Sequence, residues 1–143
     1  MPRKLTIEER EAFLSDLHVG VIAIAAEEER APLALPIWYA YEPGGLVTVL
    51  TRPDSRKGRL LRAAGRCRLV VQDEAVPYRY VSVEGPIVGM GPDLASRDEL
   101  QRMATRYLGE EGGAAYVADL PEQTVDVAYR MRPERWTTED YSE

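Results

Sequence analysis

The residues best suited to chemistry in this chain form one short run, Ser55-Arg56-Lys57. The run follows a proline turn and is predicted to open a helix, where unpaired backbone N–H groups and the positive end of the helix dipole attract an anion. Ser55 adds a hydroxyl, Arg56 a planar set of donors and Lys57 a mobile charge. This combination predicts a phosphate pocket. The residues alone leave open that Ser55 only caps the helix while Arg56 and Lys57 are solvated.

The distribution of charge along the chain also indicates an anion site at this run. The net charge is −6, yet residues 52–68 contain seven basic side chains against one acid, Asp54, so this segment carries +6 and the rest of the chain −12. General nucleic-acid binding needs a wide positive face, whereas one concentrated basic segment suits a small anionic ligand. We therefore expect a small-molecule ligand and no nucleic acid.

The composition predicts an ordinary globular protein. At 143 residues the chain is expected to form one domain, residues 1–143, with an ordered core of about residues 6–137. With one cysteine, Cys67, and one histidine, His18, neither an internal disulfide nor a zinc site is expected. The longest apolar run, Val19 to Ala26, is far shorter than the roughly 20 residues of a membrane helix. We expect a cytoplasmic protein with no metal and no membrane contact.

The first half of the chain reads as one helix followed by three strands. Thr6 and Glu9 form a capping box that opens a helix ending near Leu17. Three strand-like runs follow, and the second contains Pro32 and Pro36, which predict an edge strand or a bulge. The turn at residues 43–45 predicts a hairpin between the second and third runs. The three runs are Val19 to Ala26, Ala31 to Tyr41 and Leu46 to Thr51.

The second half alternates helices with strands. A helix is expected from about Ser55 to Gly65, and a second from the capping box at Ser96 to about Leu108, with a helical turn near residues 114–119. Two paired strands lie between the helices, the second bending at Gly85, and an alternating strand follows. These strands are Arg68 to Gln72, Tyr78 to Met90 and Thr124 to Arg132. The acidic residues 139–143 are expected to be a solvated tail.

This order of elements predicts a fold that is mainly β (α+β). Strands that follow one another through short turns favour an antiparallel sheet, and six strands with scattered helices favour a small barrel capped by helices. A doubly wound α/β fold would need a regular alternation of strand and helix, which the chain lacks.

The sequence also resembles a known family. The pattern Gly45-x-Val47-x-Val49-x-Thr51, followed by Ser55-Arg56-Lys57 and Leu69-Val70-Val71, is similar to the core of the pyridoxamine 5′-phosphate oxidases. More broadly it resembles the split-barrel flavin and deazaflavin oxidoreductases. The resemblance implies an antiparallel six-stranded split β-barrel and a homodimer with the cofactor at the subunit interface.

The resemblance also implies roles for individual residues. Arg56 and Lys57 would hold the cofactor phosphate, beside Ser55, and Leu50 and Thr51 would lie along the cofactor. Tyr80 would reach across from the second subunit. The segment that contains Pro36, Ile37 and Trp38 would run beside the cofactor ring.

Two departures from the vitamin B6 oxidases narrow the expected activity. Those enzymes have Arg where this chain has Leu35 and Lys where it has Ala40, and they carry a longer C-terminal region that binds the substrate phosphate. The segment Pro36-Ile37-Trp38 instead resembles the branch that often uses coenzyme F420, so we favour F420 as cofactor, with FMN as the alternative.

The expected function is hydride transfer between the cofactor and a small organic substrate, with the cofactor performing the chemistry. The sequence indicates no dedicated catalytic acid or base. A non-catalytic carrier or sensor of the same cofactor remains an alternative, and a nucleic-acid-binding module that uses the arginine segment is a third.

Overall fold

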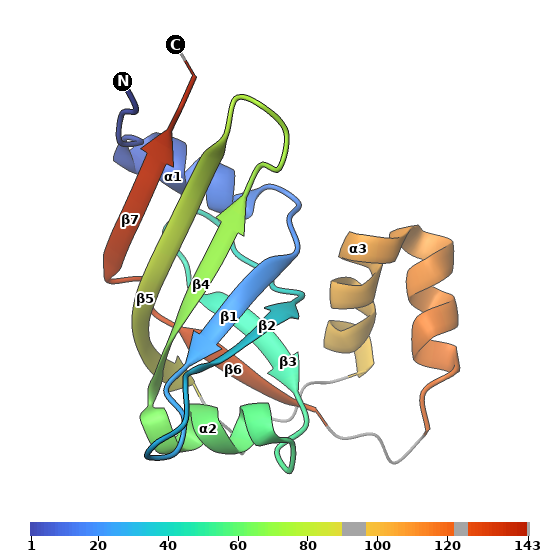
Figure 1. The fold of residues 1–143 in the computed structure, drawn as a ribbon. Helices are drawn as coiled ribbons and strands as arrows, with labels where there is room; N and C mark the ends of the chain where they lie inside the picture. The colour runs from blue at the N-terminus through green and yellow to red at the C-terminus, as the bar shows by residue number, and fades with distance from the viewer. Residues whose placement is uncertain (90–96, 122–125, 143) are drawn as a thin grey trace.

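The chain folds into a curled antiparallel sheet with three helices packed around it (Figure 1). The computed structural model describes residues 1–89, 97–121 and 126–142. The helices of this part are α1 (Ile7–Ser15), α2 (Arg56–Ala64) and α3 (Arg97–Ala118). The strands are β1 (Gly20–Ile24), β2 (Leu33–Ile37), β3 (Val47–Thr51), β4 (Arg66–Gln72), β5 (Arg79–Gly89), β6 (Val127–Met131) and β7 (Arg135–Asp140). The predicted antiparallel barrel with capping helices is confirmed.

The strands are hydrogen-bonded in the order β2-β1-β4-β5-β6-β3. The seventh strand, β7, is not part of this series and pairs with β5. Strand β5 takes part in both halves of the sheet, because its first part pairs with β4 and β7 while Ile87 and Gly89 pair with β6. Gly85, where a bend was predicted, lies near the end of the first part, which pairs with β4 as far as Pro86. A Cβ atom on Gly85 would overlap the carbonyl oxygen of Arg132, so only glycine lets the two backbones approach this closely.

The core lies inside the curl of the sheet. Alternate residues of β1, β3, β4 and β5 point inward, as the period-2 pattern requires, and α1 adds Phe13 and Leu14. The most deeply buried residues of these four strands are Ile22, Ile24, Val47, Leu69, Val71, Val81 and Val83. Figure 1 shows α1 near one end of the barrel, α2 across the other and α3 to one side.

The predicted hairpin between the second and third runs is wrong as a strand pairing. Strand β2 pairs with β1 and β3 pairs with β6, and the two runs meet only at Ala40 and Thr48, which exchange backbone hydrogen bonds of 3.0 and 2.9 Å. The chain leaves the sheet after Ile37, and Pro36 has no N–H to donate, so β2 lies at the edge of the sheet. The edge position that the prolines predict is confirmed.

Strand β7 corrects the prediction of a solvated tail. Glu139 and Asp140 belong to this strand, and Asp140 is only 4% exposed. Its backbone pairs with Arg3, and its carboxylate lies 3.1 Å from the Arg3 guanidinium. Thr138 points inward and accepts a hydrogen bond of 3.0 Å from the backbone N–H of Leu5. Because the inward-facing residues of this strand are polar, its sequence lacks the alternation of apolar and polar residues that predicts a strand.

The helices lie closer to their predicted positions than the strands do. Ser55 caps α2, and Gly65 ends it in a left-handed conformation with φ 70°. Helix α1 carries the predicted capping box and ends at Ser15 rather than near Leu17. Helix α3 kinks at Gly109 (φ 82°, ψ 171°), and its second part is longer than the predicted helical turn. The predicted features at Ser96, Met90 and Thr124 lie outside the described residues.

No helix in the part of the chain that the structure describes has the length and apolar composition to cross a lipid bilayer.

Candidate functional site

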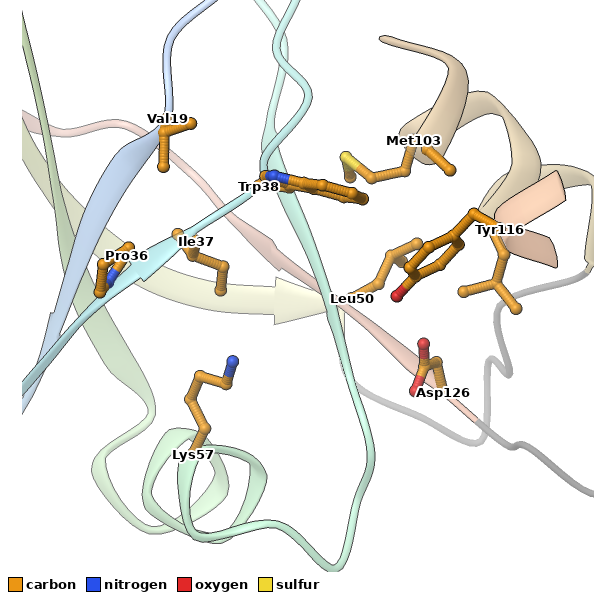
Figure 2. Close-up of a pocket in the computed structure, with 11 residues that line it drawn as sticks. Val19, Pro36, Ile37, Trp38, Leu50, Lys57, Met103, Tyr116 and Asp126 are labelled. Carbon is orange, nitrogen blue, oxygen red and sulfur yellow. The ribbon is translucent and has the colours of Figure 1, made fainter. Parts of the chain in front are cut away.

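A cavity of about 370 Å³ opens where β2 and β3 end, between α2 and α3 (Figure 2). It brings together five of the nine predicted site residues: Pro36, Ile37, Trp38, Leu50 and Lys57. These residues lie on β2 or directly after it, on β3 and in the first turn of α2, and β3 leads directly into the loop before α2. The rest of the wall comes from Val19, from Asp126 and from Leu100, Met103, Ala104 and Tyr116 of α3.

Lys57 is the basic residue of this cavity. It occupies the first turn of α2, and its ammonium group extends into the space below Ile37 (Figure 2). Among the described residues it has no hydrogen-bond or ion-pair partner within the protein. A positive charge without a partner, close to the N-terminus of a helix, makes this end of the cavity suitable for an anion.

The opposite wall of the cavity is aromatic. The Trp38 ring stacks on the Tyr107 ring of α3, with ring centroids 5.0 Å apart and an angle of 7° between the ring planes. The Tyr116 ring is tilted against Trp38, with ring centroids 5.6 Å apart. The Tyr107 hydroxyl donates to the carbonyl oxygen of His18 at 2.7 Å and accepts from the backbone N–H of Tyr39 at 3.0 Å. Helix α3 therefore fixes the orientation of the Trp38 ring.

Sequence reasoning missed the contribution of α3 to the site. Tyr107 and Tyr116 lie on opposite sides of the kink at Gly109, so no single helical face carries both. A helical tyrosine is equally compatible with a core or a surface position, and no signal in the sequence indicated that these two would meet Trp38.

Asp126 is the acidic residue of the cavity. It precedes β6 and lines the cavity, with its carboxyl group below Tyr116 (Figure 2). Burial raises the pKa of Asp126 above its ordinary value, and the charges of Arg52 and Lys57 partly offset this rise. The cavity thus carries an ammonium and a carboxyl group on an otherwise largely apolar surface.

Comparison with known protein families agrees with this architecture. The family model of pyridoxamine 5′-phosphate oxidase matches residues 6–140, which is nearly the whole chain. The chain belongs to the pyridoxamine 5′-phosphate oxidase family. Comparison with curated protein sequences finds no match.

Solved structures show the same fold at low sequence identity. An F420 reductase is 21% identical with a TM-score of 0.69, over 89% of this chain and 94% of the other. A conserved hypothetical protein from Mycobacterium tuberculosis is 21% identical with a TM-score of 0.73, over 96% and 86% of the two chains. An FAD-binding protein from Mesorhizobium loti is 23% identical with a TM-score of 0.71, over 100% and 98%. At these identities the likeness establishes the fold alone.

Three further predicted cofactor-binding residues of this family member, Ser55, Thr51 and Arg56, lie outside the cavity wall. Ser55 caps α2, because its hydroxyl accepts from the backbone N–H of Gly58 at 3.0 Å and donates to the carbonyl of Arg52 at 2.7 Å. Thr51 lies next to it, with the two side-chain oxygens 3.2 Å apart. Arg56 forms an ion pair with Glu27, with a shortest N–O distance of 3.0 Å.

The remaining predicted residue, Tyr80, lies on the outer face of the sheet. It pairs with Gln72 of β4 and Glu139 of β7, on the side away from the core. Val21, Pro36 and Val70 belong to the same outer face, because the register places Val21 opposite both Pro36 and Val70. A second cavity of about 580 Å³ hollows this face, and Val19 and Pro36 line both cavities.

Three other arginines of the basic segment, Arg59, Arg62 and Arg68, bind within the protein. Arg62 donates to the Tyr129 hydroxyl at 2.8 Å and to the carbonyl of Pro53 at 2.7 Å. Arg59 donates to the carbonyl of Asp54, and Arg68 binds Ser82 and Glu84. These contacts connect the arginines to the loop before α2, to β6 and to β5. Much of the positive charge of the segment is therefore engaged by hydrogen bonds within the protein and is not available to a ligand.

Proposed function

We propose that the protein is a cytoplasmic oxidoreductase that binds coenzyme F420, or FMN in its place, in the Lys57 cavity and transfers a hydride between that cofactor and a small organic substrate. The observation that carries the proposal is the Lys57 ammonium group, which has no partner in the described part of the chain and extends into a cavity with apolar and aromatic walls.

The residues present fit a cofactor that carries a phosphate on a chain attached to a flat ring. A volume of about 370 Å³ lies in the range of known ligand pockets, roughly 300–1,000 Å³. Lys57 supplies the anion-binding end, and Pro36, Ile37 and Trp38 offer an apolar surface against which a ring can pack. The F420 reductase and the FAD-binding protein that share the fold support a flavin-type ligand.

When bound, the flavin or deazaflavin ring supplies the hydride chemistry. The protein's part is to bind and orient the cofactor. Lys57 fixes the phosphate, and the stack of Trp38 on Tyr107 gives the aromatic wall a defined orientation. The apolar side chains Met103 and Leu100 of α3 keep water away from this wall.

Direct titration tests the proposal. The protein is titrated separately with F420 and with FMN, and binding is followed by absorbance and fluorescence. Lys57→Ala is expected to weaken binding by about 2 to 5 kcal/mol if the bound phosphate is desolvated, because it leaves that phosphate without its partner charge. The chain offers a matched control, since its other lysine is the exposed Lys4, and Lys4→Ala should leave the affinity unchanged. Failure of both cofactors to bind would refute the proposal.

Turnover separates an enzyme from a cofactor carrier. A protein that binds F420 or FMN with Lys57-dependent affinity but transfers no hydride to or from any of a panel of small acceptors and donors would be the carrier. Transfer that disappears in Lys57→Ala and survives in Lys4→Ala would establish the oxidoreductase.

We also infer that the protein works as a homodimer with the cofactor site next to the subunit interface. The outer face of the sheet exposes apolar side chains, among them Val21, which is 40% exposed, and Val19, which is 57% exposed. Such a face on a small protein is typical of an interaction surface. Tyr80 shares this face and lies outside the Lys57 cavity of its own chain, as expected of a residue that serves the partner's site.

The dimer is tested by sedimentation. Val21→Glu places a charge in the middle of the outer face and is expected to yield a monomer. Val88→Glu is the matched control, because Val88 is an exposed strand valine that does not line the outer-face cavity. A monomeric wild-type protein at micromolar concentration would contradict the inference.

A further inference from the structure

Asp126 is a carboxyl group in the cavity that the proposed hydride transfer does not use. It is partly buried, and among the described residues it has no hydrogen-bond or ion-pair partner. A polar group that loses water without gaining a partner costs free energy, so a partner supplied by a ligand would recover that cost. Asp126 therefore has an unmet capacity to accept hydrogen bonds inside the candidate site.

The position of Asp126 relative to Lys57 restricts what that ligand group can be. Both residues line the same cavity, and the charge of Lys57 acts on the Asp126 carboxyl group, yet the two side chains form no ion pair. Figure 2 shows both groups on the side of the cavity away from Trp38, with Leu50 between them. A ligand that places its phosphate at Lys57 would bring the atoms next to that phosphate close to Asp126.

The atoms next to the phosphate are the same in both candidate cofactors. FMN and F420 each join the ring to the phosphate through a ribityl chain, whose hydroxyl groups donate hydrogen bonds. A carboxylate is a strong acceptor for such hydroxyls, and O–H···O⁻ bonds are among the strongest hydrogen bonds in proteins. The ring would then lie toward the apolar and aromatic walls.

We propose that Asp126 is a specificity-determining residue that accepts hydrogen bonds from the ribityl hydroxyls of the cofactor. The inference rests on the proposed cofactor site and adds a second polar contact to it. It predicts that the cavity prefers a phosphate carried on a polyol chain over a phosphate carried on a plain alkyl chain. A carboxylate that merely repelled the phosphate would give no such preference.

The test compares two ligands that differ only in the chain. One is FMN, and the other is a flavin whose phosphate is carried on an unsubstituted pentyl chain. The same pair is prepared with the 5-deazaflavin ring, so whichever ring the protein prefers is covered. Wild type is expected to bind the polyol ligand about tenfold more tightly than the alkyl ligand, which is the size of one hydrogen bond to a charged group.

Three variants identify the source of that preference. Asp126→Leu removes the acceptor and should bind both ligands equally. Asp126→Asn keeps an acceptor oxygen in the same place and should keep most of the preference. Asp119→Leu is the matched control, because Asp119 is an exposed acid outside the cavity wall, and it should behave as wild type. Melting temperatures show that each variant is folded.

The outcomes separate this inference from the proposed function. If Asp126→Leu weakens or tightens both ligands by the same factor, the inference is overturned while the cofactor site stands. If wild type binds no ligand of either ring series, the proposed function fails and the inference fails with it. If the preference for the polyol chain is lost in Asp126→Leu and kept in Asp126→Asn, both stand.

Discussion

The ring of Trp38 lies parallel to the ring of Tyr107, with centroids 5.0 Å apart, and the Tyr107 hydroxyl is held by the backbone at both His18 and Tyr39. One helical tyrosine thus joins the end of β2, the start of β1 and the aromatic wall of the cavity. Its ring and its hydroxyl have separable roles, which two substitutions distinguish.

Tyr107→Phe keeps the stacked ring and removes the hydroxyl. It leaves the backbone N–H of Tyr39 without its acceptor, so we expect the free energy of unfolding to fall by about 1–3 kcal/mol in urea denaturation. Cofactor affinity should change little. Tyr107→Leu also removes the stack, and it should weaken cofactor binding in addition. Equal cofactor affinities for the Phe and Leu variants would show that the stack has no part in binding.

Glu27 is paired with Arg56, which is predicted to bind the cofactor phosphate. The guanidinium is paired with the Glu27 carboxylate, and an exposed ion pair of this kind is worth about 0–1 kcal/mol. If Arg56 also binds the phosphate, Glu27→Gln should tighten cofactor binding by up to about fivefold. Glu28→Gln, at the exposed neighbouring position, is the control. A Glu27→Gln protein that binds the cofactor as wild type does would remove Arg56 from the phosphate site.

Acid should weaken the contact between Arg3 and the first turn of α1. The hydrogen-bonded Arg3 guanidinium and the backbone N–H of Thr6 lower the pKa of Glu9 to about 2, from an ordinary value of 4.5. Because the folded-state pKa is depressed, this pairing stabilises the fold above about pH 4.5 and is lost as the pH falls toward 2. Glu9→Gln should therefore lower the melting temperature at pH 7 and have progressively less effect as the pH falls below 4.5. An effect independent of pH would contradict this assignment.

Cys67 should be inert in the folded protein. Burial inside the barrel raises the pKa of its thiol to about 12, so almost no thiolate exists at pH 8. A thiol-specific reagent should label the denatured chain rapidly and the native chain only as fast as it unfolds. Fast labelling of the native protein would show that the thiol is accessible.

The local features of the sequence predicted the structure well. Thr6, Ser55 and Gly65 are helix ends set by short-range hydrogen bonds and backbone conformation, and each lies where the sequence placed it. The pairing of β4 with β5 also followed from neighbouring strands. Long-range pairings did not follow. The partner of β3 is β6, nearly eighty residues away, and nothing in either strand identifies the other.

The candidate site also has a part that the sequence predicted and a part that it did not. The residues that β2, β3 and α2 bring to the cavity were predicted from one continuous region and its family resemblance, and Lys57 lies among them. Tyr116 and Asp126 reach the cavity through the course of the chain after α2, which hydrophobic periodicity does not determine. Strand β7 escaped prediction for a related reason, because Thr138 and Asp140 are polar residues facing inward, with partners in the N-terminal segment.

Val19 and Pro36 line both the Lys57 cavity and the hollow on the outer face of the sheet. A ligand that shifts these two residues on one side would change the free energy of binding on the other. By thermodynamic linkage the effect is reciprocal, so a cofactor that strengthens subunit association is itself bound more tightly by the associated form. The apparent affinity for cofactor should then rise with protein concentration, and dilution should release both the partner and the cofactor.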